Sequence, residues 1–158
     1  MKKTLELDRI DRRLLTELQR NSQLSTPELA EIVGASVPTC YRRIKRLRES
    51  GAITADVCLV DPLKVGAAML IVVEVELERE RLDLHEAFKR AMAKAPEVTQ
   101  CYGVTGEFDF VLMVMVPDLD SYNRFTEKAF YGNANVRKFR SLFVLHRVKF
   151  STAVPLLP

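Results

Sequence analysis

The sequence TPELAEIVGASVPTCYRRIKRLR, residues 26–48, predicts two short helices joined by a tight turn. Gly34 stands between the two helical patterns and ends the first, because glycine accepts the positive φ that a helix C-terminus often requires. The second pattern places four apolar side chains on one helical face: Val37, Cys40, Ile44 and Leu47. Two helices joined by such a turn are typical of a helix-turn-helix, which indicates double-stranded DNA as a partner.

Two start signals overlap at the beginning of the first of these helices. Ser25 and Glu28 have the spacing of a capping box, and Pro27 suits a first helical position after Thr26. The sequence leaves both Ser25 and Thr26 open as the cap. For the second helix, Ser36 is the expected cap.

The outer face of the second helix is cationic. Residues 36–50 contain five Lys or Arg and one acid, Glu49. An ordinary solvated amphipathic helix can also carry such a face, but the preceding capped helix and turn favour DNA binding. We expect seven residues to form the DNA-binding surface: Ser36, Pro38, Thr39, Arg42, Arg43, Lys45 and Arg46.

These residues are expected to divide by position along the helix. The N-terminal ones reach base edges, and Arg42 and Arg43 lie against the major groove, where arginine can fork onto guanine. Lys45 and Arg46 lie further along and are expected at phosphates, where they add affinity without sequence choice. Tyr41 fits either the edge of the core or a phosphate contact.

Composition limits the remaining possibilities. The 158 residues can form one large domain or two small ones, and the longest apolar run, 65–73, is too short to span a bilayer. With no signal-peptide pattern, we expect a cytoplasmic protein. Three widely spaced cysteines are expected to be small buried hydrophobes and not metal ligands: Cys40, Cys58 and Cys101. We expect no metal and no cofactor.

Charge is divided unevenly along the chain. Residues 1–60 hold 11 Lys or Arg and 8 Asp or Glu, whereas residues 61–158 hold 13 of each. The excess thus accompanies the helix pair, as binding to phosphate requires.

The first 60 residues predict a winged helix-turn-helix domain. A first helix is expected with Asp8 as its cap and a buried stripe at its apolar positions, Ile10, Leu14, Leu15 and Leu18. A short hairpin at residues 53–60 is expected to form the wing. Residues 61–66, which begin with Asp-Pro, are the expected hinge.

Residues 67–158 predict a ferredoxin-like domain, so that the fold class is α+β. From residue 67 the apolar period is two, which predicts strands. A strand from 67, a helix near 84–95, strands at 98–105 and 108–116, a helix from 119 and a strand within 136–150 follow one another. This β-α-β-β-α-β order is that of the ferredoxin-like sandwich.

Both faces of the predicted sheet are apolar. In the strand at 108–116, Val111, Met113 and Met115 alternate with Phe110 and Leu112. Since helices cover only one face, the other needs a second cover. We expect the sheet of a second copy, giving a two-fold homodimer, with the C-terminal tail as the alternative cover.

Five stretches together resemble the leucine-responsive regulatory protein / AsnC family of bacterial and archaeal transcription factors. They cover almost the whole length: residues 7–21, 24–53, 60–66, 96–110 and 148–158. The resemblance implies dimerisation through the sheet, assembly of dimers into octamers, and an amino acid or related metabolite bound where dimers meet. Arg48 is a departure, because the family usually has an acid there.

The turn TGEFD, residues 105–109, is the expected effector site. Gly106 permits a tight turn whose amides can face a carboxylate, and Asp109 offers an acceptor for an ammonium group. Without the resemblance, a purely structural hairpin is the simpler interpretation. The complete expected set is Tyr102, Thr105, Gly106, Glu107, Asp109 and Ser141.

No catalytic motif of a common class occurs, and the two histidines lack a metal-ligand spacing. The two-domain layout also resembles siroheme decarboxylases, which would need a cluster such as Arg137, Arg140, His146 and Arg147 to hold tetrapyrrole carboxylates. A ligand-sensing dimer without DNA binding is disfavoured by the cationic helix. The sequence therefore predicts a sequence-specific DNA-binding transcriptional regulator that responds to an amino acid or related metabolite, and no enzyme.

Overall fold

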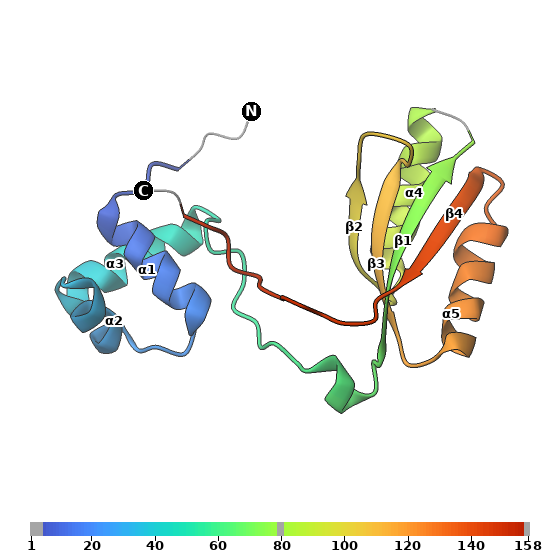
Figure 1. The fold of residues 1–158 in the computed structure, drawn as a ribbon. Coiled ribbons are helices and arrows are strands. Elements are labelled where there is room, and N and C mark those ends of the chain that lie inside the picture. The colour runs from blue at the N-terminus through green and yellow to red at the C-terminus, as the bar shows by residue number, and fades with distance from the viewer. Residues whose placement is uncertain (1–4, 79–80, 157–158) are drawn as a thin grey trace. The chain divides into compact units, whose positions relative to one another are not determined.

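The computed structural model describes residues 5–78 and 81–156; the outer ends of both predicted domains, 1–4 and 157–158, lie outside the described residues. The chain divides into two compact units (Figure 1). The first combines the residues up to Leu59 with the C-terminal segment from Lys149, and the second spans Val60–Val148. The C-terminal segment therefore groups with the helical unit, whereas the sequence analysis placed it in the second domain.

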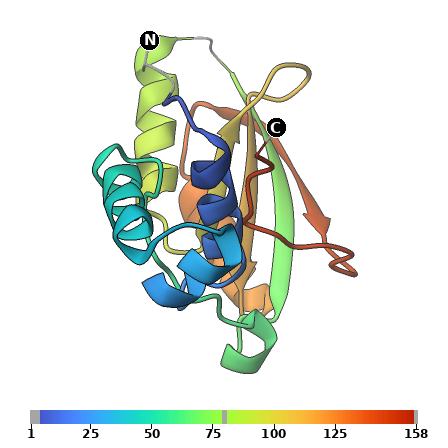
Figure 2. The same ribbon diagram turned by 90° about the vertical axis from the view of Figure 1, so that its left-hand side faces the viewer.

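Three helices form the first unit: α1 (Arg9–Arg20), α2 (Thr26–Val33) and α3 (Val37–Glu49) (Figure 2). Asp8 caps α1 by accepting two backbone N–H groups. Ser25 caps α2 in a capping box with Glu28, which decides between the two open alternatives. Gly34 follows α2 with a φ of 70°, as the helix-turn-helix pattern predicted.

The core of the first unit draws apolar side chains from all three helices, namely Leu14, Leu29, Ala30, Val33, Cys40 and Ile44. Arg13 of α1 donates to the backbone carbonyls of Ile32 and Val33. These carbonyls belong to the last turn of α2 and have no partner within that helix. The arginine therefore fastens the end of α2 to α1.

The hairpin expected at residues 53–60 does not form in the described residues. This segment contains no strand, and Val57, Leu59 and Val60 are each more than half exposed. A strand pattern needs a partner strand, and the described part of this chain supplies none here. Cys58 is also exposed, which corrects the expectation that all three cysteines are buried.

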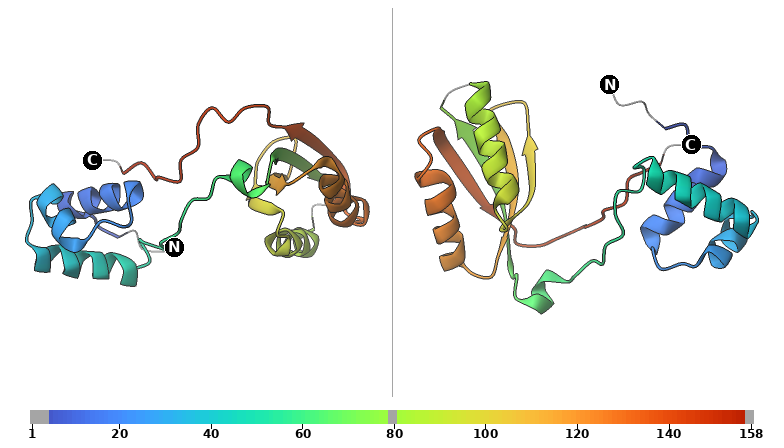
Figure 3. Two further views of the ribbon diagram at one scale, coloured as in Figure 1. Left: turned by 90° about the horizontal axis from the view of Figure 1, so that it is seen from below. Right: turned by 180° about the vertical axis from the view of Figure 1, so that it is seen from behind.

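The second unit begins with a 3-10 helix, η1 (Pro62–Val65), and contains a four-stranded antiparallel sheet in the order β2-β3-β1-β4. Helices α4 and α5 cover one face of this sheet (Figure 3). The elements are β1 (Met69–Leu77), α4 (Leu82–Lys94), β2 (Val98–Gly103), β3 (Phe110–Val116), α5 (Leu119–Thr126), a π-helical continuation η2 (Glu127–Tyr131) and β4 (Val136–Phe143). This is the predicted ferredoxin-like order.

Alternation along the strands separates the two faces of the sheet. The helix-covered face forms the core, with Ile71 and Val73 of β1 and Leu112 of β3 fully buried. On the uncovered face, Val72 pairs with Met113 on one side and Leu142 on the other.

Further along β1, the uncovered face changes character, because Glu74 forms an ion pair with Arg140 of β4 at 2.6 Å. The face that was expected to be apolar is therefore apolar at one end and charged at the other. No helix within residues 5–78 and 81–156 has both the length and the apolar character of a membrane span.

Candidate nucleic-acid interface

The five cations of α3 differ in what they contact. Arg42 is exposed and forms no ion pair within the described residues. Lys45 lies 3.8 Å from Glu49 one turn later, and Arg48 pairs with Asp56 at 3.0 Å. Because these two pairs are exposed, they contribute little stability and exchange readily with solvent.

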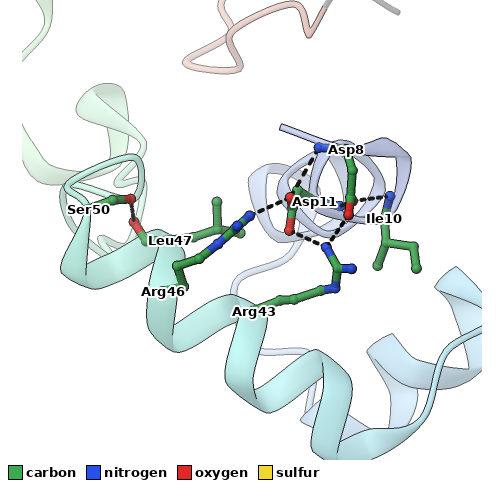
Figure 4. A network of polar contacts seen from close by, with 7 residues as sticks. All are labelled: Asp8, Ile10, Asp11, Arg43, Arg46, Leu47 and Ser50. Carbon is green, nitrogen blue, oxygen red and sulfur yellow. Dashed lines mark hydrogen bonds and ion pairs between the residues drawn. The ribbon is translucent and has the colours of Figure 1, made fainter. Parts of the chain in front are cut away.

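Arg43 and Arg46 instead turn toward the N-terminus of α1 (Figure 4). Asp11 lies at the centre of this contact, with a side chain only 1% exposed. Its Oδ1 accepts from Nη1 of Arg43 at 3.0 Å, and its Oδ2 accepts from Nη2 of Arg46. The same nitrogen of Arg43 also pairs with Oδ2 of Asp8.

The two aspartates cap α1 at the same time. Oδ1 of Asp8 accepts the backbone N–H groups of Ile10 and Asp11 at 2.9 Å, and Oδ2 of Asp11 accepts that of Asp8 at 3.1 Å. A buried carboxylate is tolerated only where cations and hydrogen bonds surround it. The network therefore joins the cap of α1 to the side of α3.

These contacts correct the expected place of Arg43. It follows Cys40 by three residues and precedes Leu47 by four, so it shares the buried face of α3. Its side chain is 21% exposed and faces α1, whereas the sequence predicted that it faces the major groove. Arg46, at 49% exposed, lies at the border of the two faces and is held by Asp11.

Sequence reasoning missed Asp11, although a signal was present. Asp11 precedes Leu14 and Leu15 by three and four residues, so it belongs to the buried stripe of α1. Aspartate is almost never fully buried unless it is paired. An acid in that stripe, with two arginines three residues apart on α3, indicates an ion pair between the helices.

The first turn of α3 presents the remaining expected residues. Ser36 occupies the cap position as predicted, but its hydroxyl donates to Oγ1 of Thr39 at 2.9 Å and accepts no backbone N–H group. Pro38 is exposed, and Tyr41 is 63% exposed and so does not belong to the core edge. With Arg42, these side chains form a continuous outer face of α3, which we call the α3 outer face.

Protonation of Asp8 should weaken this unit in acid. Its pKa is lowered, first because the backbone N–H of Asp11 donates to it and second because Arg43 does. The pKa of Arg43 is raised, first by its side-chain hydrogen bond to Asp8 and second by the one to Asp11. A group with a lowered folded pKa stabilises the fold above its unfolded pKa and loses that effect as pH falls through the folded value.

We therefore expect the wild-type chain to lose stability as the pH falls below about 4. The Asp8→Asn variant keeps a capping oxygen but has no titrating group at this position, so its stability should fall less. Thermal unfolding of both proteins at neutral and acidic pH measures the difference. Parallel curves for the two proteins would contradict the role given to Asp8.

The expected effector residues do not come together in one protomer. Tyr102 lies on β2 and Ser141 on β4, which are the two opposite edges of the sheet. Ser141 faces α5, where its hydroxyl lies 2.6 Å from that of Tyr122. It therefore belongs to the packing of α5 on the sheet, which corrects its predicted place.

Asp109 also differs from its expected role. Its Oδ2 accepts the backbone N–H of Leu77 at 2.7 Å, and its own N–H bonds to the carbonyl of Val75 at 2.9 Å. The residue therefore fastens the start of β3 to β1. The sequence had instead predicted that its carboxylate is open to an ammonium group. The exposed turn that remains consists of Thr105, Gly106 with a φ of 122°, and Glu107.

The arginines of the decarboxylase alternative are already paired. Arg137 bonds to Glu76 at 2.7 Å, and Arg140 is held by Glu74. His146 and Arg147 follow the end of β4 and so lie outside the sheet. Two of the four residues that this alternative would need are therefore engaged with glutamates.

Two family models match the chain. Residues 7–54 match the winged helix-turn-helix DNA-binding family, and residues 70–154 match the Lrp/AsnC ligand-binding domain. The chain belongs to the Lrp/AsnC family. It is thus a DNA-binding transcriptional regulator and not an enzyme, which overturns the decarboxylase alternative.

Relatives of this Lrp/AsnC member match nearly full length. An uncharacterized HTH-type transcriptional regulator of Sinorhizobium fredii is 44% identical over 152 residues, 96% of this chain and 90% of that protein. The leucine-responsive regulatory protein of Escherichia coli is 36% identical over 146 residues, 92% and 89% of the two chains. A transcriptional regulator from Neisseria meningitidis, solved in complex with L-Met, has a TM-score of 0.89 at 31% identity, covering 95% and 97%.

Proposed function

We propose that the α3 outer face enters the major groove of promoter DNA, with Arg42 as its base-reading side chain. The observation that carries this proposal is the division of the α3 cations, since Arg42 is exposed and not engaged in an ion pair within the described residues. Pro38 and Thr39 precede it by one turn and stand at the end of the helix that reaches base edges in helix-turn-helix proteins. Lys45 and Arg48 pair with the exposed acids Glu49 and Asp56, so a phosphate can replace either acid with little desolvation.

We also propose that the chain acts as a homodimer in the cytoplasm. The uncovered sheet face carries an apolar patch formed by Leu70, Val72, Val111, Met113, Met115 and Leu142. The C-terminal segment, which was the alternative cover, groups with the first unit. Two subunits related by a two-fold axis present two α3 helices to half-sites about one helical turn apart. Stacking of such dimers into octamers extends the same proposal.

For the effector, we propose an amino acid at the exposed turn 105–107. Gly106 is exposed and has a positive φ of 122°, and turns with such a backbone conformation can present successive amides to a carboxylate. The related regulator from Neisseria meningitidis was solved with L-Met, which supports an amino acid as the ligand class. Tyr102, half exposed on the neighbouring strand β2, can flank the bound molecule.

One titration tests both the DNA-binding surface and the effector site. A labelled duplex from upstream of the chain's own gene is titrated with the full-length protein, alone and with each common amino acid. We expect binding whose apparent affinity changes about fivefold or more with at least one amino acid, in line with ordinary allosteric coupling. Thr105→Val should weaken that response, because it removes one hydroxyl from the turn, while Thr54→Val in the first unit serves as the control.

The possible outcomes distinguish a failure of the DNA-binding surface from a failure of the effector site. No binding to the duplex contradicts the DNA-binding surface. Binding that none of the amino acids alters contradicts the effector class, and an equal response of the wild type and Thr105→Val contradicts the placement at the turn.

A further inference from the structure

We propose that Asp8 and Asp11 are specificity-determining positioning residues, which withhold Arg43 and Arg46 from DNA phosphates by holding them against α1. The inference rests on the proposed function, because it concerns which of the five α3 cations reach DNA. It gives the N-terminal cap of α1 a role in choosing DNA sequence, although neither aspartate lies on α3.

Two acidic side chains at the start of α1 face two basic side chains of α3. The aspartates lie three residues apart at the start of α1, and the arginines lie three residues apart on α3. Each arginine has a carboxylate facing it, and Nη1 of Arg43 is shared between both. Such pairing fixes the rotation of α3 about its axis, and it thereby directs Arg42 away from α1.

Burial makes this network different from the other ion pairs of the unit. Arg20 and Glu17 form a pair whose arginine is 70% exposed, so a phosphate can compete for it with little desolvation. Asp11 is 1% exposed, and releasing Arg43 from it would leave a buried carboxylate with one cation fewer. Nε of Arg43 is itself buried and has no hydrogen-bond partner among residues 5–78 and 81–156, which places the guanidinium within the interface.

Withholding cations raises specificity for a simple reason. A phosphate contact strengthens binding to every sequence equally, whereas a base contact strengthens binding to one. Two additional cations per subunit would increase the affinity for the large excess of non-cognate DNA and so lower the specificity ratio. The aspartates keep this sequence-independent contribution small while preserving the helix that reads bases.

The test uses the full-length chain and two duplexes, the upstream region and a scrambled duplex of equal composition. Affinities are measured between about 50 and 200 mM salt, where the slope of affinity against salt reports the number of phosphate contacts. The variants are Asp11→Asn and Asp8→Asn, and Glu17→Gln is the matched control, since it removes one negative charge from α1 without touching α3.

We expect the slope to steepen by about one for each arginine released per subunit, on both duplexes. The preference for the upstream duplex over the scrambled one should fall in the same variants. Glu17→Gln should keep the wild-type slope. A purely structural role of the aspartates would lower the amount of folded protein without steepening the slope, which circular dichroism distinguishes.

Other variants cover the case in which Asp11→Asn does not fold. Asp8→Asn retains a capping oxygen and removes only the charge facing Arg43. Arg43→Gln should leave the wild-type slope unchanged, because a withheld cation makes no phosphate contact. A slope reduced by about one in Arg43→Gln, or wild-type slopes in both folded aspartate variants, overturns the inference alone. Failure of the wild-type chain to bind either duplex overturns the proposed function and the inference with it.

Discussion

Replacing Arg42 with alanine weakens binding to the cognate site by about 1–3 kcal/mol per subunit and leaves the fold intact. The loss arises because a guanidinium forked onto guanine has no substitute in alanine. The fold is unaffected because Arg42 is exposed and holds no carboxylate within the described residues. Arg43→Ala differs in kind, since it removes a partner from the buried Asp11.

Arg20→Ala is the matched control for Arg42. Arg20 is an exposed cation of the same unit, at 70% side-chain exposure, but lies on α1. Fluorescence anisotropy with the cognate duplex and its single-base variants measures both proteins. Arg42→Ala should also lose discrimination at one base position of each half-site. Equal affinities of the two variants would remove Arg42 from the reading surface.

The largest expected effect on stability is that of Leu112→Ala, which costs about 2–5 kcal/mol. Leu112 lies on β3 beneath the helices and is 0% exposed, so alanine leaves a cavity among Val73, Phe88 and the other side chains of this core. Leu82→Ala makes the same chemical change at a side chain that is 78% exposed and should stay within about 0.5 kcal/mol of wild type.

Denaturant unfolding measures both leucine variants against wild type. If the two units unfold in separate transitions, only that of the second unit should shift in Leu112→Ala. Similar midpoints for the two variants would contradict the arrangement of the sheet core.

Local signals in the sequence identified most of the fold. The cap at Asp8 and the turn at Gly34 depend on a few neighbouring residues, so they could be recognised without the rest of the chain, whereas Ser25 and Thr26 remained open until the structure showed the capping box of Ser25. The period of two along β1 and β3 likewise separated the two faces of each strand, because side chains alternate between the faces.

The wrong predictions concern features that depend on contacts between residues far apart in the sequence. The segment 53–60 has the composition of a strand, but pairing depends on a partner strand that the described residues do not provide. Ser141 was grouped with Tyr102 because the pattern does not reveal that β2 and β4 occupy opposite edges.

Arg43 shows the limit most clearly for the site. Charge alone placed it on the DNA-binding surface, but its spacing from Cys40 and Leu47 places it on the buried face, and Asp11 on another helix holds it there. The complementary spacing of two acids and two arginines was readable from the sequence. The contact between them required the packing of α1 on α3.

Selection of duplexes from a randomised pool tests most directly whether the α3 outer face reads DNA from a two-fold dimer. The wild-type chain should enrich a sequence with two symmetric half-sites about one helical turn, or 10–10.5 base pairs, apart. Arg42→Ala should enrich a sequence that is degenerate at one position in each half-site. No enrichment by the wild-type chain, or the same sequence enriched by both proteins, would contradict the claim.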